Sequence, residues 1–289
     1  MSGDLHCYTR LSNGSMGIEE IIALAKSVGI ETIAITDHDC LAGTVRAKII
    51  GERNGVKVVP GVEISSTDKE TGKEVHILCY LPEHPDRLEG LCHRNTVARK
   101  RASQYMMLKA AQRYPVSAEL MKRCASGSTN MYPQHIMHAL MECGVADSFY
   151  GKVYNELFSA ESENNIIVKP SFAGVDEVIS EIHSAGGIAV LSYAGCYSIE
   201  DEITRYVAMG LDGIEVWNPV CCEEKVAELL QYAKKNSLLT TGGSCFKGLY
   251  NRQALTLGSV AAPKAQLQEL LGFKAKQKRL MKKNQAAET

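Results

Sequence analysis

The 289-residue chain has no apolar run approaching the roughly 18–20 residues that a membrane helix needs. Its formal net charge is only −1, so the whole molecule has no strong bias towards nucleic acid or a membrane surface. No signal peptide is expected, because Asp4 and His6 interrupt the N-terminal segment at once. The ten cysteines include no Cys-x-x-Cys pair, which argues against a zinc ribbon or a thioredoxin-type motif.

Ten cysteines without an export signal favour a reducing compartment, and we expect a cytoplasmic protein. Most of these thiols are expected to be small buried apolar residues, with Cys245 as the exception. The length suits one large domain or one domain with an insertion. Basic residues crowd the last segment, 273–289, which is interpreted as a solvated tail in preference to a phosphate-binding arm. They are Lys274, Lys276, Lys278, Arg279, Lys282 and Lys283.

Apolar strand-like segments alternate with helix-like segments over residues 1–82 and again over residues 169–272. The expected strands are residues 5–8, 32–36, 56–59, 75–81, 188–193, 213–218 and 238–241. The expected helices between and after them are residues 17–28, 42–54, 175–185, 199–209, 223–235 and 263–271. Buried short strands separated by helices predict a parallel sheet, and this number of repeats predicts a (β/α) barrel.

The alternation is interrupted after Pro82-Glu83-His84-Pro85, and residues 83–168 are predicted to form a helical insertion. Its expected helices are residues 86–114, 118–124, 132–143 and 150–158, and its one expected strand is residues 166–168. Three histidines of the helical segments, His93, His138 and His183, are interpreted as structural or exposed, as is His84 at a helix entry.

Polar residues gather where the expected strands end. They are His6, His38, Glu63, Tyr193, Asn218 and Cys245. Because the chemistry of such barrels lies at the carboxyl ends of the strands, these residues are predicted to share one mouth.

The segment Asp4-Leu5-His6-Cys7-Tyr8-Thr9 almost spells a metal-binding signature, in which a strand offers two imidazoles from one face. In this chain Tyr8 stands where the second imidazole would be. Further motifs follow in order: Ser-Asn-Gly (12–14), Ala-Ile-Thr-Asp-His-Asp (34–39), Pro-Gly-Val-Glu-Ile-Ser (60–65), Val-His-Ile-Leu-Cys-Tyr (75–80), Ser-Ala-Gly-Gly-Ile-Ala-Val-Leu (184–191) and Gly-Gly-Ser-Cys-Phe-Lys (242–247).

Together these motifs resemble the polymerase-and-histidinol-phosphatase (PHP) family of metal-dependent phosphoesterases, in the branch that acts on nucleotides and short oligonucleotides. The resemblance covers nearly the whole chain. It implies a distorted (β/α)7 TIM-like barrel with a helical insertion domain, which holds up to three metals. It also implies that metal-activated water, rather than a side chain, attacks phosphorus.

The resemblance assigns ligands to three metal positions. The first would use His6, Tyr8, Glu63 and Cys245, and the second would use Glu63, His76 and His135. The third would use Asn13, His38, Tyr193 and Lys247. His135 is favoured over His138 because Pro133-Gln134-His135 fits the insertion pattern of the family.

Several of these residues are weak ligands. Asn13 offers only a neutral oxygen, and Lys247 has donors and no lone pair. Tyr8 and Tyr193 would ligate only as phenolates, so we expect the third metal to be absent. Cys245 either shifts the first position towards zinc or ferrous iron or simply fills the space of an aspartate. His38 is either a ligand or a hydrogen-bonding residue at a strand end.

The same substitutions suggest how a phosphate would be bound. Lys247 supplies a fixed positive charge, Asn13 removes a negative one, and Arg99 and Arg101 resemble basic residues that face the pocket in related proteins. The alternative for the arginines is a solvated helix face.

Three function classes remain. The favoured prediction is a metal-dependent phosphoesterase for a nucleotide or another small phosphate ester, with one or two ions of zinc, iron or manganese. The alternative is a PHP-like pseudoenzyme that binds phosphate or a nucleotide, with or without metal. A third is a metal-dependent hydrolase that attacks a carbon centre. No protein partner is indicated.

Overall fold

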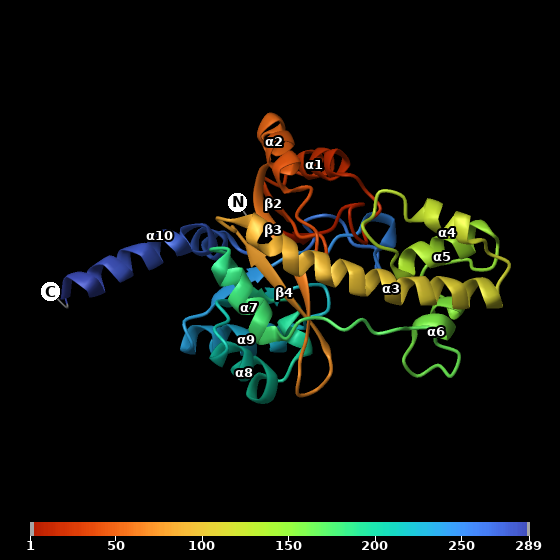
Figure 1. The fold of residues 1–289 in the computed structure, drawn as a ribbon. Coiled ribbons are helices and arrows are strands. Elements are labelled where there is room, and N and C mark those ends of the chain that lie inside the picture. The colour runs from red at the N-terminus through yellow and green to blue at the C-terminus, as the bar shows by residue number, and fades with distance from the viewer. Residues whose placement is uncertain (1–2, 288–289) are drawn as a thin grey trace.

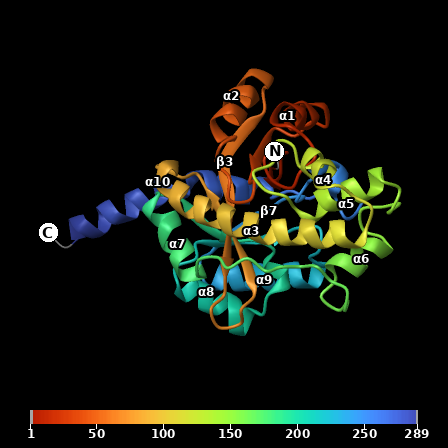
Figure 2. The ribbon, with the colours of Figure 1, turned by 45° about the vertical axis from the view of Figure 1, so that its right-hand side comes forward.

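The computed structural model describes the backbone of residues 3–287 and the side chains of residues 3–279 (Figures 1 and 2). Seven strands form one sheet in which neighbours along the chain are also neighbours in space. They are β1 (Gly3–Cys7), β2 (Thr32–Ile35), β3 (Lys57–Thr67), β4 (Glu74–Tyr80), β5 (Ile188–Leu191), β6 (Gly213–Trp217) and β7 (Leu239–Gly242).

The sheet curls until its two edges meet. The amide of Tyr8, just after β1, donates to the carbonyl of Phe246, beyond β7, at 2.9 Å. Cys7 and Phe246 also form a parallel bridge. The predicted barrel is therefore confirmed as a nearly closed, distorted barrel of seven strands.

The prediction of a parallel sheet is wrong for β4, which runs antiparallel to both β3 and β5. Residues 68–73 join β3 to β4 as a short hairpin loop, and a parallel pair would need a helical crossover instead. β3 is also longer than expected and continues to Thr67. Glu63 therefore lies inside a strand and not after its end.

The barrel helices are α1 (Ile18–Ser27), α2 (Thr44–Asn54), α7 (Val175–Ser184), α8 (Thr204–Ala208), α9 (Glu223–Lys235) and α10 (Lys264–Ala287). Short helical turns are η1 (Pro85–Leu88), η2 (Ala194–Cys196), η3 (Ile199–Ile203) and η4 (Gly248–Tyr250). The last helix was expected to stop at residue 271 but runs to Ala287 and points away from the barrel (Figure 1). The side chains of Lys282 and Lys283 lie outside the described residues. No described helix, over residues 3–287, is long and apolar enough to cross a membrane.

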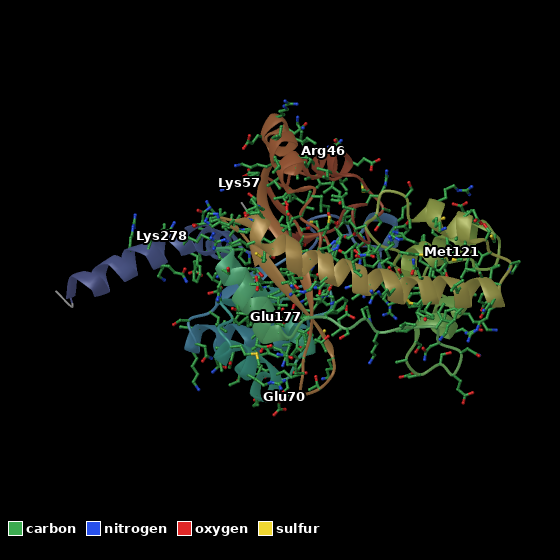
Figure 3. All side chains as sticks on the ribbon, viewed as in Figure 1. Arg46, Lys57, Glu70, Met121, Glu177 and Lys278 are labelled. Atoms are coloured by element: carbon green, nitrogen blue, oxygen red, sulfur yellow. The ribbon has the colours of Figure 1, made fainter. Side chains whose placement is uncertain are left out.

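Between β4 and α7 the chain forms a second lobe of α3 (Glu89–Arg113), α4 (Ala118–Cys124), α5 (Pro133–Glu142) and α6 (Lys152–Phe158). The expected strand at residues 166–168 is wrong, because these residues follow α6 without a strand partner among the residues described. The lobe has its own core, in which Met121, Ile136 and Leu140 are fully buried. Figure 3 shows Met121 among these helices, at the opposite end of the molecule from Lys278. The barrel and the insertion lobe therefore each bury their apolar residues in a core of their own.

The expectation that most cysteines are buried holds for half of them. Cys143, Cys196 and Cys222 are exposed, and Cys124 and Cys221 are partly buried. A thiol at a helix end, such as Cys124 and Cys143 in the insertion, is not forced into a core.

Candidate functional site

Buried polar side chains from five strands or strand ends meet at one end of the barrel. His6 comes from β1, Glu63 from β3, His76 from β4 and Glu215 from β6, and Cys245 follows β7. All but His76 are at least nine-tenths buried, although four of the five carry ionisable acid or imidazole groups. Burying them is costly unless they bind each other or a ligand, so this cluster is the candidate site.

A continuous chain of hydrogen bonds links Glu215 to Glu63. Glu215 Oε1 lies 2.7 Å from His6 Nδ1, and His6 Nε2 lies 2.7 Å from the hydroxyl of Tyr8. Tyr8 in turn donates to Glu63 Oε2 at 2.7 Å. Because this hydroxyl gives its proton to Glu63, it accepts from His6. His6 then donates from both ring nitrogens, as an imidazolium does.

The charges around His6 agree with this protonation. Burial lowers the pKa of His6, but Cys245, Glu215 and Glu63 together raise it well above the ordinary value. The Tyr8 hydroxyl is kept protonated, because burial and the Glu63 charge raise its pKa. In this arrangement Tyr8 is a hydrogen-bond donor to Glu63.

His38, Glu63 and His76 form a separate group whose ligand atoms all lie within 4.8 Å of one another. His38 Nδ1 is 3.1 Å from Glu63 Oε2 without the alignment of a hydrogen bond. His76 Nδ1 is also buried and has no hydrogen-bond partner. Burial lowers the pKa of His38, which keeps its ring neutral. Two imidazoles, each with an unpaired ring nitrogen, and one carboxylate are a donor set that fits a divalent transition metal.

The first predicted ligand set does not converge on one point in the same way. Cys245 Sγ lies 3.5 Å from His6 Nδ1, on the Glu215 side of the ring. Tyr8 and Glu63 lie on the Nε2 side. The structure therefore groups His6 and Cys245 with Glu215, within 4.8 Å, and leaves Glu63 with the other group.

His135, the predicted insertion ligand, is buried but is not among the residues grouped with Glu63 and His76. Its Nδ1 accepts a bond from the amide of Tyr132 at 3.2 Å. Tyr132 contacts both rings, since its ring centroid lies 5.8 Å from that of His38 and 5.8 Å from that of His135.

Two predicted cations border the site and one does not. Lys247 Nζ lies 4.5 Å from the centre of the Tyr8 ring. The Arg99 guanidinium lies 3.7 Å from Asp39 and 3.2 Å from Glu74, and its buried Nε has no partner. Arg101 is exposed on α3, and no contact with the site is recorded for it among the described side chains.

Two of the remaining predicted residues, Asn13 and Asn218, have a buried polar atom without a partner, and the third, Tyr193, contacts His6. Asn13 is 5% exposed, and its Oδ1 is buried without a partner. Asn218, after β6, has an unpaired Nδ2. Tyr193 packs edge-on against His6, with ring centroids 5.5 Å apart.

The backbone at the mouth is strained at three non-glycine residues. Asp39, Tyr193 and Cys245 have φ angles of 50°, 50° and 53°. Each such residue costs about 1 kcal/mol or more, and such strain tends to gather at functional sites. Here it fixes the direction in which the chain leaves β2, β5 and β7.

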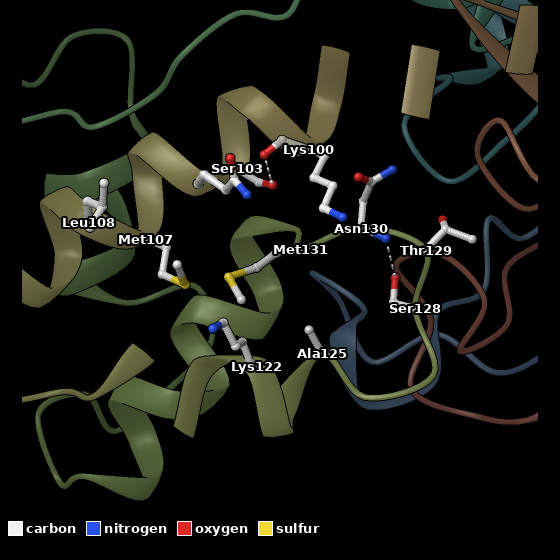
Figure 4. Close-up of a pocket in the computed structure, with 11 residues that line it drawn as sticks. Lys100, Ser103, Met107, Leu108, Lys122, Ala125, Ser128, Thr129, Asn130 and Met131 are labelled. Atoms are coloured by element: carbon white, nitrogen blue, oxygen red, sulfur yellow. Dashed lines mark hydrogen bonds between the residues drawn. The ribbon is translucent and has the colours of Figure 1, made fainter. Parts of the chain in front are cut away.

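A cavity of about 240 Å³ opens beside the site. Its lining includes Tyr193, Cys245 and Lys247 from the site and Tyr150 and Arg252 from neighbouring segments. A larger cavity of about 490 Å³ lies in the insertion. Lys100, Lys122 and Asn130 are on its wall (Figure 4). That larger cavity shares no residue with the clusters described above, whereas the smaller one shares Cys245 with them.

Glu215 is the main site residue that the sequence reasoning missed. It lies in Gly-Ile-Glu-Val-Trp, where every other residue is apolar or glycine, and it is fully buried. A lone carboxylate inside an apolar strand was the available signal, since such a group needs a buried partner.

Comparison with known proteins agrees with the geometry. A family model for the PHP domain matches residues 4–185. A phosphoribosyl 1,2-cyclic phosphate 1,2-diphosphodiesterase of Eggerthella lenta is 33% identical, over 87% of this chain and 96% of its own length. A 5'-3' exoribonuclease of Haemophilus influenzae is 26% identical, over 84% of this chain and 89% of its own. The crystal structure of a proposed metal-dependent phosphoesterase from Bifidobacterium adolescentis superposes with a TM-score of 0.84, at 27% identity, and covers 93% of this chain and 95% of the other.

Proposed function

The chain belongs to the PHP domain family, and from that premise we propose that it is a metal-dependent phosphoesterase that hydrolyses a nucleotide or another small phosphate ester at the barrel mouth. The observation that carries the proposal is the group formed by His38, Glu63 and His76, with its unpaired buried imidazole nitrogens. These three residues would hold one divalent cation. When bound, such an ion polarises phosphoryl oxygens and lowers the pKa of water.

The protein supplies the remaining charge from its own side chains. His6, held as an imidazolium between Glu215 and Tyr8, carries a positive charge in a buried place. Lys247 adds a second at the rim of the cavity. Fixed cations that need no reorganisation stabilise the charge that builds up on a phosphate during hydrolysis. This arrangement supports a reduced metal content, because side-chain cations can supply part of the charge stabilisation that further ions would otherwise supply.

The cavity beside the site suits a nucleotide. Its lining combines the aromatic rings of Tyr150 and Tyr154 with Arg252, whose guanidinium lies 5.8 Å from the Tyr150 ring centre. Aromatic faces stack on bases, and an arginine binds phosphate. The names of two relatives refer to a cyclic sugar phosphate and to RNA, and both agree with a nucleotide-like phosphate ester as the substrate.

A second candidate is the pseudoenzyme that binds phosphate or a nucleotide without turnover. One observation favours it: Tyr8 and Glu215 occupy both nitrogens of His6, which is a family ligand position. The two candidates share the ligand and differ in whether they hydrolyse it.

The test is metal content and turnover measured on the same untagged protein, purified without chelator. Elemental mass spectrometry gives the metal per chain, and release of phosphate from nucleoside bisphosphates, cyclic phosphates and short RNA gives turnover. Turnover that chelation abolishes and added zinc, iron or manganese restores supports the enzyme. Nucleotide binding by calorimetry without turnover, with any of the three ions, supports the pseudoenzyme.

Replacing Lys247 with methionine is expected to lower kcat/KM for phosphate esters by about 10²-fold, because it removes a cation next to the reacting phosphate. Methionine keeps an unbranched side chain beside Tyr8 but removes the ammonium that lies 4.5 Å from the centre of its ring. Steady-state kinetics on wild type and variant measure the effect. Lys152→Met, on the exposed surface of the insertion, is the matched control and should retain wild-type rates. Equal kcat/KM for K247M and wild type would exclude Lys247 from phosphate binding.

A further inference from the structure

A second cluster of potential metal ligands lies in the insertion, outside the barrel. Cys124 is the last residue of α4, and His138 and Glu142 lie one turn apart on the same face of α5. One ligand atom from each lies within 4.8 Å of the other two. From this convergence we propose that Cys124, His138 and Glu142 bind a zinc ion.

The distances suit the ion. Cys124 Sγ is 3.5 Å from Glu142 Oε1, and His138 Nε2 is 3.7 Å from the same oxygen. A tetrahedral zinc with bonds of about 2.3 Å to sulfur and about 2.0 Å to oxygen separates these ligands by about 3.5 Å. One thiolate, one imidazole and one carboxylate are all ordinary zinc ligands.

Each of the two α5 ligands is held by a partner on its other polar atom. His138 Nδ1 lies 2.9 Å from the hydroxyl of Tyr250, which leaves Nε2 to face the cluster. Glu142 Oε2 accepts a bond from Arg123 at 2.6 Å, which leaves Oε1 to face it. The His138 ring also packs edge-on against Phe149 and Tyr250, with ring centroids 5.8 Å away in each case. Partners of this kind orient ligands and fix the tautomer of a metal-bound histidine.

The site has three protein ligands and space for a fourth. A cavity of about 310 Å³ is lined by Cys124, His138 and Glu142 and by Arg10 and Ser15 of the barrel. A zinc ion with three protein ligands keeps one position for water or another small ligand. The ion would join α4 to α5, and through Tyr250 it would be coupled to the loop after β7 that carries Lys247.

Zinc stoichiometry in matched variants tests the site. The full chain is loaded with excess ZnSO4 under a non-thiol reductant, free ion is removed, and zinc per chain is measured by elemental mass spectrometry. Cys124→Ser and His138→Gln should each bind one equivalent less than wild type. Cys143→Ser changes an exposed cysteine next to Glu142 and should bind as much as wild type. Zinc content unchanged in both C124S and H138Q, or lowered equally in C143S, would overturn the proposal.

Cobalt separates this site from the barrel. In Cys245→Ser protein the thiol next to His6 and Glu215 is gone, so a Co²⁺–thiolate charge-transfer band must come from another cysteine. That band should persist in C245S and disappear in C245S/C124S, while circular dichroism stays unchanged. A band that survives in C245S/C124S counts against Cys124. Glu63→Gln changes only the barrel group. Metal lost in this variant therefore reports on the proposed phosphoesterase centre, and the insertion site should bind zinc as in wild type.

Discussion

Glu63→Gln is expected to lower kcat/KM for phosphate-ester hydrolysis by about 10³-fold and to remove one equivalent of bound metal. Glu63 is fully buried and accepts from Tyr8 at 2.7 Å and from Ser192 at 2.9 Å, beside His38. Glutamine keeps the shape but removes the negative charge that would hold a divalent cation. Phosphate release and metal content, measured on the same samples, give both readings.

Glu52→Gln is the matched control, because Glu52 is exposed on α2. It should retain wild-type turnover and metal. The melting temperature of E63Q tells whether the loss of activity is local or comes from unfolding. We expect E63Q to remain folded while its activity is reduced. Turnover by clean, folded E63Q at the wild-type rate would refute a mechanism that depends on this carboxylate.

The largest expected effect on stability follows from Asp4→Ala, which should lower the free energy of unfolding by about 3–5 kcal/mol. Asp4 is fully buried in β1 and accepts from the Ser244 amide at 2.9 Å, the Ser244 hydroxyl at 2.5 Å and the Gly258 amide at 2.8 Å. Alanine would leave these donors buried without an acceptor, at the seam where β1 meets the segment after β7. Urea denaturation measures the change.

Asp147→Ala, at an exposed position of the insertion, should change stability by less than about 0.5 kcal/mol. A loss in D4A no larger than that in D147A would mean that the seam does not depend on Asp4. Zinc binding at Cys124 gives an internal check, because D4A that remains folded should keep the insertion site.

The sequence was most informative where a residue type is rare in its surroundings. His6, His38 and Glu63 were identified because they stand at or just after the ends of expected apolar strands and within motifs that resemble those of the PHP family. Glu215 was overlooked because no such motif surrounds it, although a carboxylate among apolar strand residues is just as rare. The barrel was predictable for a similar reason, since strand and helix patterns alternate clearly outside the insertion.

Direction and pairing were not predictable from local patterns. The alternation of apolar residues in β4 is the same whether the strand runs parallel or antiparallel, and only the short loop before it carries that information. Likewise, the sequence alone does not tell whether Tyr8 is a phenolate ligand or a hydrogen-bond donor. Its contact with both His6 and Glu63 depends on strands that are far apart in the sequence.

The antiparallel pairing of β4 with β5 has a consequence for the speed of folding. It joins Ile77 to Leu191, and the whole insertion lies in the loop between them. Closing so long a flexible loop is entropically costly, and contacts between residues so distant in sequence slow folding. A collapsed helical lobe shortens the loop that must be closed. We therefore expect the folding rate of the barrel to depend on the stability of a lobe that contributes no strand to it.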